Sequence, residues 1–362
     1  MTDAEDFAGR LRDPQAGVRR EAVAALGRTR DPRWAPTLAE ALHDRDRDVR
    51  DAAVSSLIEI GGDAVAEAVA PSLNSPDREI RTSAAEVLQE AERSADDPLI
   101  SLLDGPDEET KILALDLLGA TGGPKAVDAA IAALGDASPG VRNAAASSLG
   151  ALGGTRAVDP LCEMVSSEED EWVAFAAVQA LRETSAGDIS AALAAALRRG
   201  GLLAAAAVSA LAEVGGPDAV SVLLRHLPEA SDDAASHIIA ATCEIADRCC
   251  DPAELPPGVR ADLVRLLTDA STSHPDEWTR YRAVQTLGRF HCGEAEDLLL
   301  SLVGGGSPLV RLASAEALGR IGGGRAEGAL MALSDDRDRD IAQVAREALM
   351  RATGGAGGSR EG

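Results

Sequence analysis

Four residues in the second half of the chain have the types and the spacing for a metal site. Cys249 and Cys250 end one segment with a helical pattern, and His291 with Cys292 ends the next such segment. If neighbouring segments stack, three thiolates and one imidazole would meet, a ligand set that Zn²⁺ accepts. Adjacent cysteines serve one closed site poorly, and Cys243 stands where the pattern elsewhere has Leu, as a small hydrophobe would. We therefore expect no bound metal.

No catalytic motif accompanies this cluster. The sequence has no GxSxG elbow, and the Gly-rich runs at 304–306 and 322–324 lack the Gly-Lys of a phosphate loop. The acidic turns at 44–48 and 335–340 space carboxylates two apart, as calcium loops do. Counted from Asp44, the turn lacks the Gly and Glu that such a loop needs. The sequence indicates no catalytic residue and no cofactor, which favours a protein that is not an enzyme.

The composition bears on partners and location. Against 60 Asp and Glu stand 35 Lys and Arg, for a net charge of −25, so we expect neither nucleic acid nor an anionic membrane as a partner. The only lysines are Lys111 and Lys125, and this Lys-poor, acid-rich balance predicts a halophilic, haloarchaeal protein. From the acidic N-terminal segment we expect no export signal, and no apolar run is long enough to predict a membrane span. We expect a cytoplasmic protein with reduced thiols.

The elements that would position any site are repeats. Segments such as VRREAVAALGR, VRDAAVSSLIEIGG and VRNAAASSLGALGG recur about every 31 residues, eleven times. In each copy the first, fifth and ninth positions are apolar or small, which is a helical period, and the ninth is Leu in ten copies. A second apolar stripe precedes each, so the unit is a helix, a turn and a second helix. These second helices are predicted to begin near residues 18, 49, 80, 110, 141, 173, 203, 235, 279, 310 and 341.

The V-R-x-x-A-x-x-x-L-G pattern resembles the HEAT-like repeat of the phycobilisome-lyase type. That resemblance implies an all-α fold, a right-handed α-solenoid, in which the second helices line the concave face. It implies a protein-protein interaction scaffold, with a lyase-like or chaperone-like factor acting on a cofactor-bearing partner as the alternative. Deoxyhypusine hydroxylase resembles this architecture too, but it needs His-Glu pairs. None of the five histidines is followed by Glu: His43, His226, His237, His274 and His291.

Stacked repeats predict one solenoid domain over residues 1–353. One offset between copies is 44 residues, and Pro252, Pro256 and Pro257 interrupt helix there, which predicts an inserted loop over 247–260. The glycine-rich tail at 354–362 is expected to be disordered.

The second position of the second helix is basic in seven copies. Three of these basic residues have an Asp six positions before them. This places a carboxylate in the turn, where the next guanidinium can reach it, so we interpret the row as a structural charge ladder and not as a phosphate-binding row. The basic residues are Arg19, Arg50, Arg81, Lys111, Arg142, Arg280 and Arg311.

A partner surface is predicted at the last three copies. Positions 3, 7 and 11 of each second helix point away from the buried stripe, and in the middle copies they are small and bland. In the last three copies they include Tyr281, Arg289, Arg320 and Arg351, residue types that favour interfaces. The hypothesis is that these four contact an acidic partner segment. The alternative is that the arginines form ordinary i,i+4 pairs with Glu on a solvated face.

Overall fold

The computed structural model describes residues 7, 9–184, 189–230, 232–249 and 251–354. Every regular element in these ranges is a helix, so the chain is all-α, as predicted. The structure divides the chain into two compact units, Met1–Ile189 and Ser190–Gly362, where the sequence predicts one domain over 1–353. Each unit is described by itself.

The first unit contains eleven α-helices and four short 3₁₀ segments among its described residues. They are α2 (Ala16–Arg28), η1 (Pro32–Trp34), α3 (Ala35–Ala41), α4 (Arg47–Ile60), α5 (Asp63–Val69), η2 (Ala70–Asn74), α6 (Arg78–Glu90), η3 (Glu92–Ala95), α7 (Asp96–Leu102), α8 (Glu108–Thr121), α9 (Pro124–Ala133), α10 (Pro139–Leu152), η4 (Thr155–Ala157), α11 (Val158–Ser167) and α12 (Glu171–Thr184).

The described part of the second unit has ten α-helices and one 3₁₀ segment. They are α13 (Ser190–Arg199), α14 (Gly201–Val214), α15 (Pro217–His226), η5 (Leu227–Glu229), α16 (Asp232–Cys249), α17 (Pro257–Ser273), α18 (Glu277–Leu287), α19 (Gly293–Gly305), α20 (Pro308–Ile321), α21 (Gly324–Leu333) and α22 (Arg339–Gly354).

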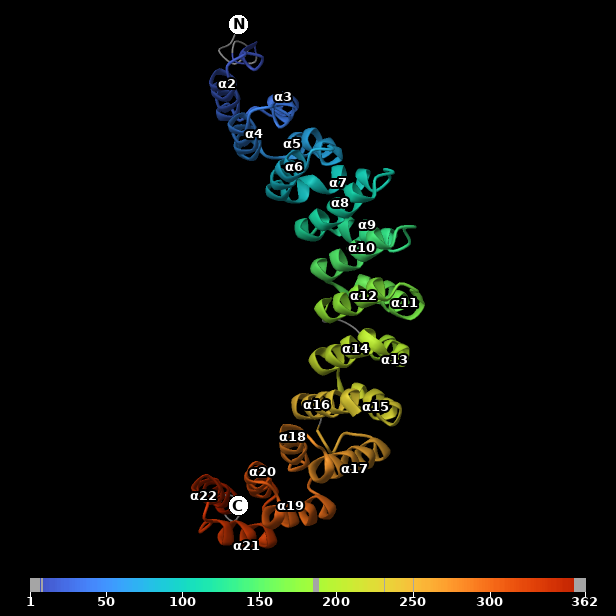
Figure 1. Ribbon diagram of the computed structural model, residues 1–362, viewed down its shortest axis with the longest axis vertical. Helices are drawn as coiled ribbons and strands as arrows, with labels where there is room; N and C mark the ends of the chain where they lie inside the picture. Colours follow the sequence, from blue (N-terminus) through green and yellow to red (C-terminus); the bar gives the residue numbers. More distant parts are fainter. Residues whose placement is uncertain (1–6, 8, 185–188, 231, 250, 355–362) are drawn as a thin grey trace, which may run out of the picture. The chain divides into compact units, whose positions relative to one another are not determined.

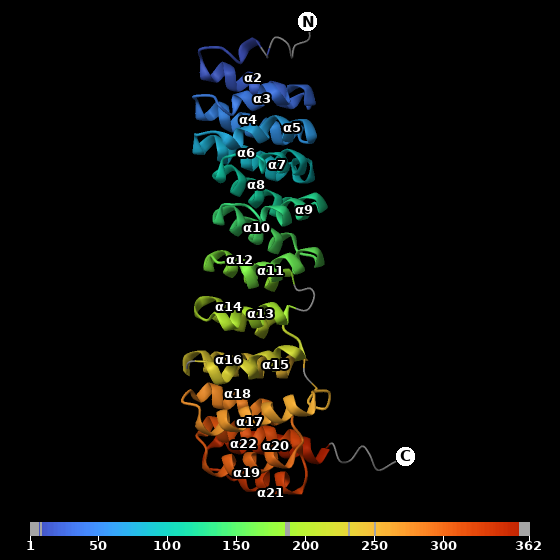
Figure 2. The same ribbon diagram turned by 90° about the vertical axis from the view of Figure 1, so that its right-hand side faces the viewer.

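Within each unit the helices form two layers. Even-numbered helices pack on one another in sequence order and form what we call the B layer, while odd-numbered helices form the A layer (Figure 1, Figure 2). These even-numbered helices are the predicted second helices, and each predicted start lies two or three residues inside the observed helix. The hydrophobic period therefore placed the right residues in the right layer.

Short-range signals start and stop the B helices. Asp77 Oδ1 accepts the Glu79 N–H at 2.9 Å at the start of α6, and Asp276 Oδ2 accepts the Thr279 N–H at 2.7 Å at the start of α18. Such caps satisfy amide groups that have no partner inside the helix. At the end of α10, Gly153 has a φ of +67°, a value that side chains disfavour. The chain can therefore turn sharply into the next A helix.

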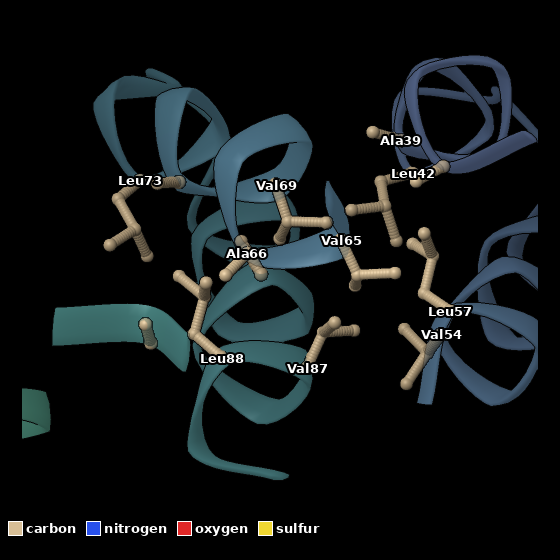
Figure 3. Packing of buried hydrophobic residues seen from close by; sticks show 14 of the residues in the cluster. Ala39, Leu42, Val54, Leu57, Val65, Ala66, Val69, Leu73, Val87 and Leu88 are labelled. Carbon is tan, nitrogen blue, oxygen red and sulfur yellow. The ribbon is translucent and has the colours of Figure 1, made fainter. Parts of the chain in front are cut away.

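Small aliphatic side chains fill the space between the layers. Figure 3 shows Val65 and Val69 of α5 between Leu57 of α4 and Leu88 of α6. Each of these four side chains is fully buried. Burying a Val or Leu stabilises the fold by roughly 1.5–3 kcal/mol. No helix could cover such a stripe without its neighbours, so each repeat depends on the next.

The inserted loop predicted over 247–260 is wrong in its bounds. Residues 247–249 end α16 and residues 257–260 begin α17, so helix covers half of the predicted loop. Proline is tolerated in the first turn of a helix, where its missing N–H has no partner, and Pro257 takes this place in α17. The extra residues lengthen α16 and α17 to 18 and 17 residues. Of the tail predicted at 354–362, Gly354 ends α22 and 355–362 lie outside the described residues.

Candidate functional site

A row of ion pairs ties neighbouring repeats of the first unit together. Arg19 Nε and Nη2 each donate to the Asp44 carboxylate at 2.7 Å, and Arg19 Nη1 donates to the Asp13 carbonyl at 2.9 Å. Arg142 repeats this geometry with Glu168, at 2.7 and 2.9 Å. The Arg19 guanidinium lowers the pKa of Asp44, because its hydrogen bond favours the ionised carboxylate. One guanidinium thus binds a carbonyl in the turn of its own repeat and a carboxylate of the next repeat.

Other basic residues of the row also bind a carboxylate of the next repeat. Lys111 Nζ donates to Asp136 at 2.8 Å and Arg81 Nη2 to Glu109 at 2.6 Å, while Arg50 pairs with Glu79 and Arg311 with Asp336. Six of the seven predicted basic residues thus pair with a carboxylate, whereas Arg280 donates to the carbonyls of His274 and Pro275. Asp13, Asp44 and Asp136 each give a carbonyl to the Arg six positions later, and the carboxylates of Asp44 and Asp136 bind the basic residue of the preceding repeat. Arg50 and Arg81 bind instead a Glu in the first turn of the next B helix.

The ladder is interrupted in the second unit. The second position of α14 is Ala204, which has no donor, and that of α16 is Ser236. Ser236 Oγ lies 3.0 Å from His274 Nε2, and His274 precedes Arg280 by six residues, so a Ser–His bond takes the place of an ion pair here. The described residues show no ion pair of the ladder between α14 and α16; there Arg248 of α16 donates to the Ala212 and Gly215 carbonyls at the end of α14.

A second contact between B helices depends on glycine at the tenth position. A Cβ added to Gly27 would lie 2.5 Å from Ser56 Cβ, and one added to Gly319 would lie 2.6 Å from Ala348 Cβ. These helices therefore approach more closely than any side chain at that position allows. In α14 and α16 the tenth positions are Ala212 and Glu244, so neither helix has the glycine on which this contact depends; α4 and α6 also lack it.

A groove with a volume of about 610 Å³ lies between α14 and α16. These two helices have neither the basic residue at the second position nor the glycine at the tenth position. Small and aliphatic side chains make its floor, and polar groups stand at its rim. The floor includes Ala204, Ala205, Val208, Ala212, Ile238 and Ala241, and the rim includes Arg198, Ser209, His237 and Glu244. We call this feature the B-layer groove.

A polar ridge continues from the groove along α16, α18 and α20. Glu244, at the groove rim, lies 3.9 Å from Arg282, and Asp247 accepts a hydrogen bond from Thr286 at 3.2 Å. Partial burial raises the pKa of Asp247. These contacts join α16 to α18, and Arg320 of α20 adds a contact to Gln285 of α18; we call this set the polar ridge.

The ridge contains two of the four predicted partner residues, Arg289 and Arg320. Arg289 donates to the carbonyl of Ala246 and pairs with Asp247 at 3.5 Å. Arg320 Nη1 donates to the carbonyl of Gln285 at 3.1 Å. Both arginines therefore hold neighbouring repeats together, a role that the sequence did not indicate. Among the described ion pairs there is none between Arg320 and Glu316, the i,i+4 pair that was the alternative for this residue.

Tyr281 and Arg351 differ from these two arginines. Tyr281 is half-buried, packs edge-on against Trp278 with ring centroids 5.6 Å apart, and accepts a hydrogen bond from Gln285 at 3.4 Å. Arg351 is exposed on α22, where its Nε donates to the Glu347 carbonyl at 3.4 Å. The aromatic pair and the exposed arginine are accessible surface features.

The predicted metal cluster cannot be followed completely. Cys249 has no described side chain and Cys250 lies outside the described residues. Cys292 is partly exposed just before α19, and the described residues contain no group of three or more potential metal ligands. Burial raises the pKa of Cys243 to about 12, so this thiol stays protonated and packs as a hydrophobe.

Sequence and structure comparisons place these repeats in a known family. HEAT repeats are detected over residues 5–89, 97–182 and 264–350, which together exceed half of the chain. The chain belongs to the HEAT-repeat family. No curated protein matches the sequence. None of the helices in the described ranges is both long and apolar enough to cross a membrane.

Several solved structures share the fold at low sequence identity. Kap95p, from work on its binding to RanGDP, has a TM-score of 0.58 and 14% identity, over 98% of this chain and 57% of that one. Importin beta has a TM-score of 0.55 and 15% identity, over 98% and 56%. Kap121p bound to the extreme C-terminus of the phosphatase Cdc14p has 0.58 and 12%, over 96% and 45%. The chain spans about half the length of these HEAT-type proteins, and the likeness shows the fold.

The sequence analysis missed the B-layer groove. It described the exposed positions of the middle copies as bland, and Ala205 and Ser209 are among them. The basic second residue and the glycine at the tenth position are both lost at the groove, but α12 has the same losses, at Ala174 and Arg182, so the sequence alone does not identify the groove.

Proposed function

We propose that this HEAT-repeat protein is a binding scaffold for other proteins, and that its partner lies on the B layer of the second unit. The observation that carries this proposal is the B-layer groove of about 610 Å³, which shares Glu244 with the polar ridge. Protein interfaces combine a desolvated apolar pocket for an anchor residue with a polar rim that fixes orientation. The groove offers the pocket, and the ridge offers the rim.

The size and lining of the groove support an apolar anchor. Pockets of 300–1,000 Å³ are typical of bound ligands, and 610 Å³ accommodates one or two large side chains. Its floor carries methyl groups of Ala204, Ala212 and Ala241, which would lose little entropy when covered. An aromatic or branched aliphatic side chain of a partner would therefore gain buried area at low cost.

The ridge supports a carboxylate-bearing partner beside that anchor. We propose that Tyr281, Arg289, Arg320 and Arg351 contact an acidic segment of the partner, with the exposed Arg320 and Arg351 supplying free guanidinium N–H groups. Arg289 would attract the acidic segment through its positive charge, because part of its guanidinium already donates to the Ala246 carbonyl. The Kap121p structure with a bound phosphatase C-terminus offers a precedent for a HEAT-type fold that holds a chain segment.

We also infer the setting of this function from composition. The net charge of −25 supports a halophilic protein in the cytoplasm that does not bind nucleic acid. The V-R-x-x-A-x-x-x-L-G pattern supports repeats of the phycobilisome-lyase HEAT-like type.

Capture of the partner by surface variants tests the proposal. Tagged protein is purified from its native host at native salt, and the double variant Tyr281→Ala/Arg320→Glu is compared with Arg325→Glu. The control reverses the same charge on α21 of the A layer, where Arg325 is likewise exposed. We expect the double variant to lose the main partner and Arg325→Glu to retain it. Equal retention by both variants would contradict the assignment of this surface.

A further inference from the structure

Two tryptophans lie on the surface in the same local motif. Trp172 is 68% exposed and Trp278 is 64% exposed, in a chain with only three Trp, one Tyr and three Phe. Each follows Asp-Glu and precedes a second aromatic residue by three positions, in DEWVAF and DEWTRY. A single exposed apolar residue is ordinary, but two of three tryptophans exposed in one repeated motif point to binding.

The Trp172 ring is held in place at the start of α12. Its centroid lies 6.3 Å from that of Phe175, with the planes at 73°, an edge-to-face pair. Asp170 Oδ1 accepts the Trp172 N–H at 2.9 Å, and Asn143 Nδ2 donates to the Trp172 carbonyl at 3.3 Å. The backbone of Trp172 is therefore fixed from two sides while its side chain faces water.

Acidic residues directly precede Trp172 in the sequence. Glu168–Glu171 is a run of four acidic residues next to a hollow of about 620 Å³. Glu168 is neutralised by Arg142, and Asp170 caps α12. Glu169 and Glu171 are exposed and form no ion pair within the described residues. Two exposed negative charges without an ion pair in the described structure thus lie within three residues of an exposed indole in the sequence.

We propose that Trp172, Glu169 and Glu171 form a site of the first unit for an Arg or Lys side chain of a basic protein segment. The cation would lie over the indole face, where the ring's quadrupole attracts it, and the two carboxylates would take up its charge. The N-terminal end of α12 carries a partial positive charge of about half an elementary charge, which repels a cation. This charge is smaller than the negative charge of the two carboxylates. The net charge of −25 attracts such segments from a distance. This site is separate from the B-layer groove and independent of it.

The second motif gives an internal contrast. Trp278 and Tyr281 form the same edge-to-face pair, with centroids 5.6 Å apart. Two arginines follow Trp278, Arg280 and Arg282, and only one unpaired glutamate precedes it in the described structure, Glu277. The local charge there disfavours a cation, so binding of a basic segment should depend on Trp172 and not on Trp278.

Fluorescence anisotropy of a labelled peptide tests this site. The probe is a flexible peptide of four Gly-Arg pairs, and its control has citrulline in place of each Arg, which keeps the shape and removes the charge. We expect the Arg peptide to bind at low salt and the citrulline peptide not to bind. Trp172→Ala should weaken binding about twofold to fivefold, as removal of an exposed cation–π contact does, whereas Trp278→Ala should change nothing.

A charge-matched pair of variants separates this site from the general acidity of the chain. Glu169→Gln/Glu171→Gln should weaken binding of the Arg peptide about twofold to thirtyfold. Glu86→Gln/Glu90→Gln removes two exposed charges from α6 of the same unit and should have a much smaller effect. Equal losses from the two pairs, equal binding of the citrulline peptide, or a larger loss from Trp278→Ala would each overturn the proposal. Far-UV circular dichroism verifies that every variant is folded.

Discussion

Substitution of Gly319 by Ala should loosen the last two helices of the B layer. The new Cβ would lie 2.6 Å from Ala348 Cβ and 3.0 Å from its Cα, while carbon atoms pack at about 3.5–4.0 Å. The two helices must therefore separate by about 1 Å. Overpacking of this kind costs about 1–3 kcal/mol, and the better helix propensity of Ala returns about 0.5–1 kcal/mol. The expected net loss of local stability is about 1 kcal/mol.

Two further variants isolate the steric cause. Gly328 lies in the middle of α21, and a Cβ there would meet no heavy atom within 4 Å, so Gly328→Ala should stabilise its helix by about 0.5–1 kcal/mol. Ala348→Gly removes the group that Gly319→Ala would strike. The double variant should therefore be more stable than the sum of the two single changes by about 1–2 kcal/mol.

Amide hydrogen exchange measures these effects where they occur. Repeat arrays open locally, so the exchange of peptides from α20 and α22 reports the local free energy of unfolding, and peptides from α14 serve as an unaffected reference. Slower exchange in Gly319→Ala, like that expected for Gly328→Ala, would refute the close-packing argument. Additive effects of Gly319→Ala and Ala348→Gly would refute the identity of the contact.

Three other results are expected. Arg19 lowers the pKa of Asp44 in the folded protein below its ordinary value of 3.8. The pair therefore stabilises the fold above about pH 4, and this stabilisation is lost as the pH falls through the pKa of Asp44 in the folded protein. Urea unfolding should show Asp44→Asn less stable than the wild type at pH 7 and equally stable near pH 2. The thermal midpoint, followed by circular dichroism, should rise between about 0.1 M and 2 M KCl, as the Debye length falls from about 10 Å toward 3 Å or less; an unchanged midpoint would remove the halophilic inference. In Arg289→Ala the Ala246 carbonyl loses its donor, so the local free energy of unfolding of α16 should fall by about 0.5–1.5 kcal/mol and its amide hydrogen exchange should become faster. Arg351→Ala should change the local free energy of unfolding by less than about 0.5 kcal/mol.

The B helices could be located from sequence because their signal is local. Apolar residues at positions one, five and nine, from Val18 to Leu26 in the first copy, lie on one face of a helix whatever surrounds it. The same reasoning failed at the 44-residue offset. Pro256 and Pro257 exclude an uninterrupted helix, but Pro257 also suits a helix start, and only the packing of α17 on α18 determines which applies.

The candidate site was harder to predict because it depends on distances between helices. The ladder could be anticipated from its basic residues, but the partner of Arg19 is 25 residues away, and stacking had to bring Asp44 to it. At the groove, Ala204 stands where seven other repeats have a basic residue, and Ala212 stands where some repeats have glycine. A sequence pattern records the presence of a residue type more readily than the space that its absence leaves.

Site-specific photocrosslinking tests most directly whether the B-layer groove binds a protein. A photoreactive phenylalanine analogue replaces Ser209, which is exposed at the groove rim, or Met331, which is 62% exposed on α21 of the A layer. After irradiation in the native host, the Ser209 position should give one discrete crosslinked protein that disappears in the Tyr281→Ala/Arg320→Glu background, and the Met331 position should give none. The same crosslinked protein from both positions, or none from Ser209, would contradict the groove as the binding surface.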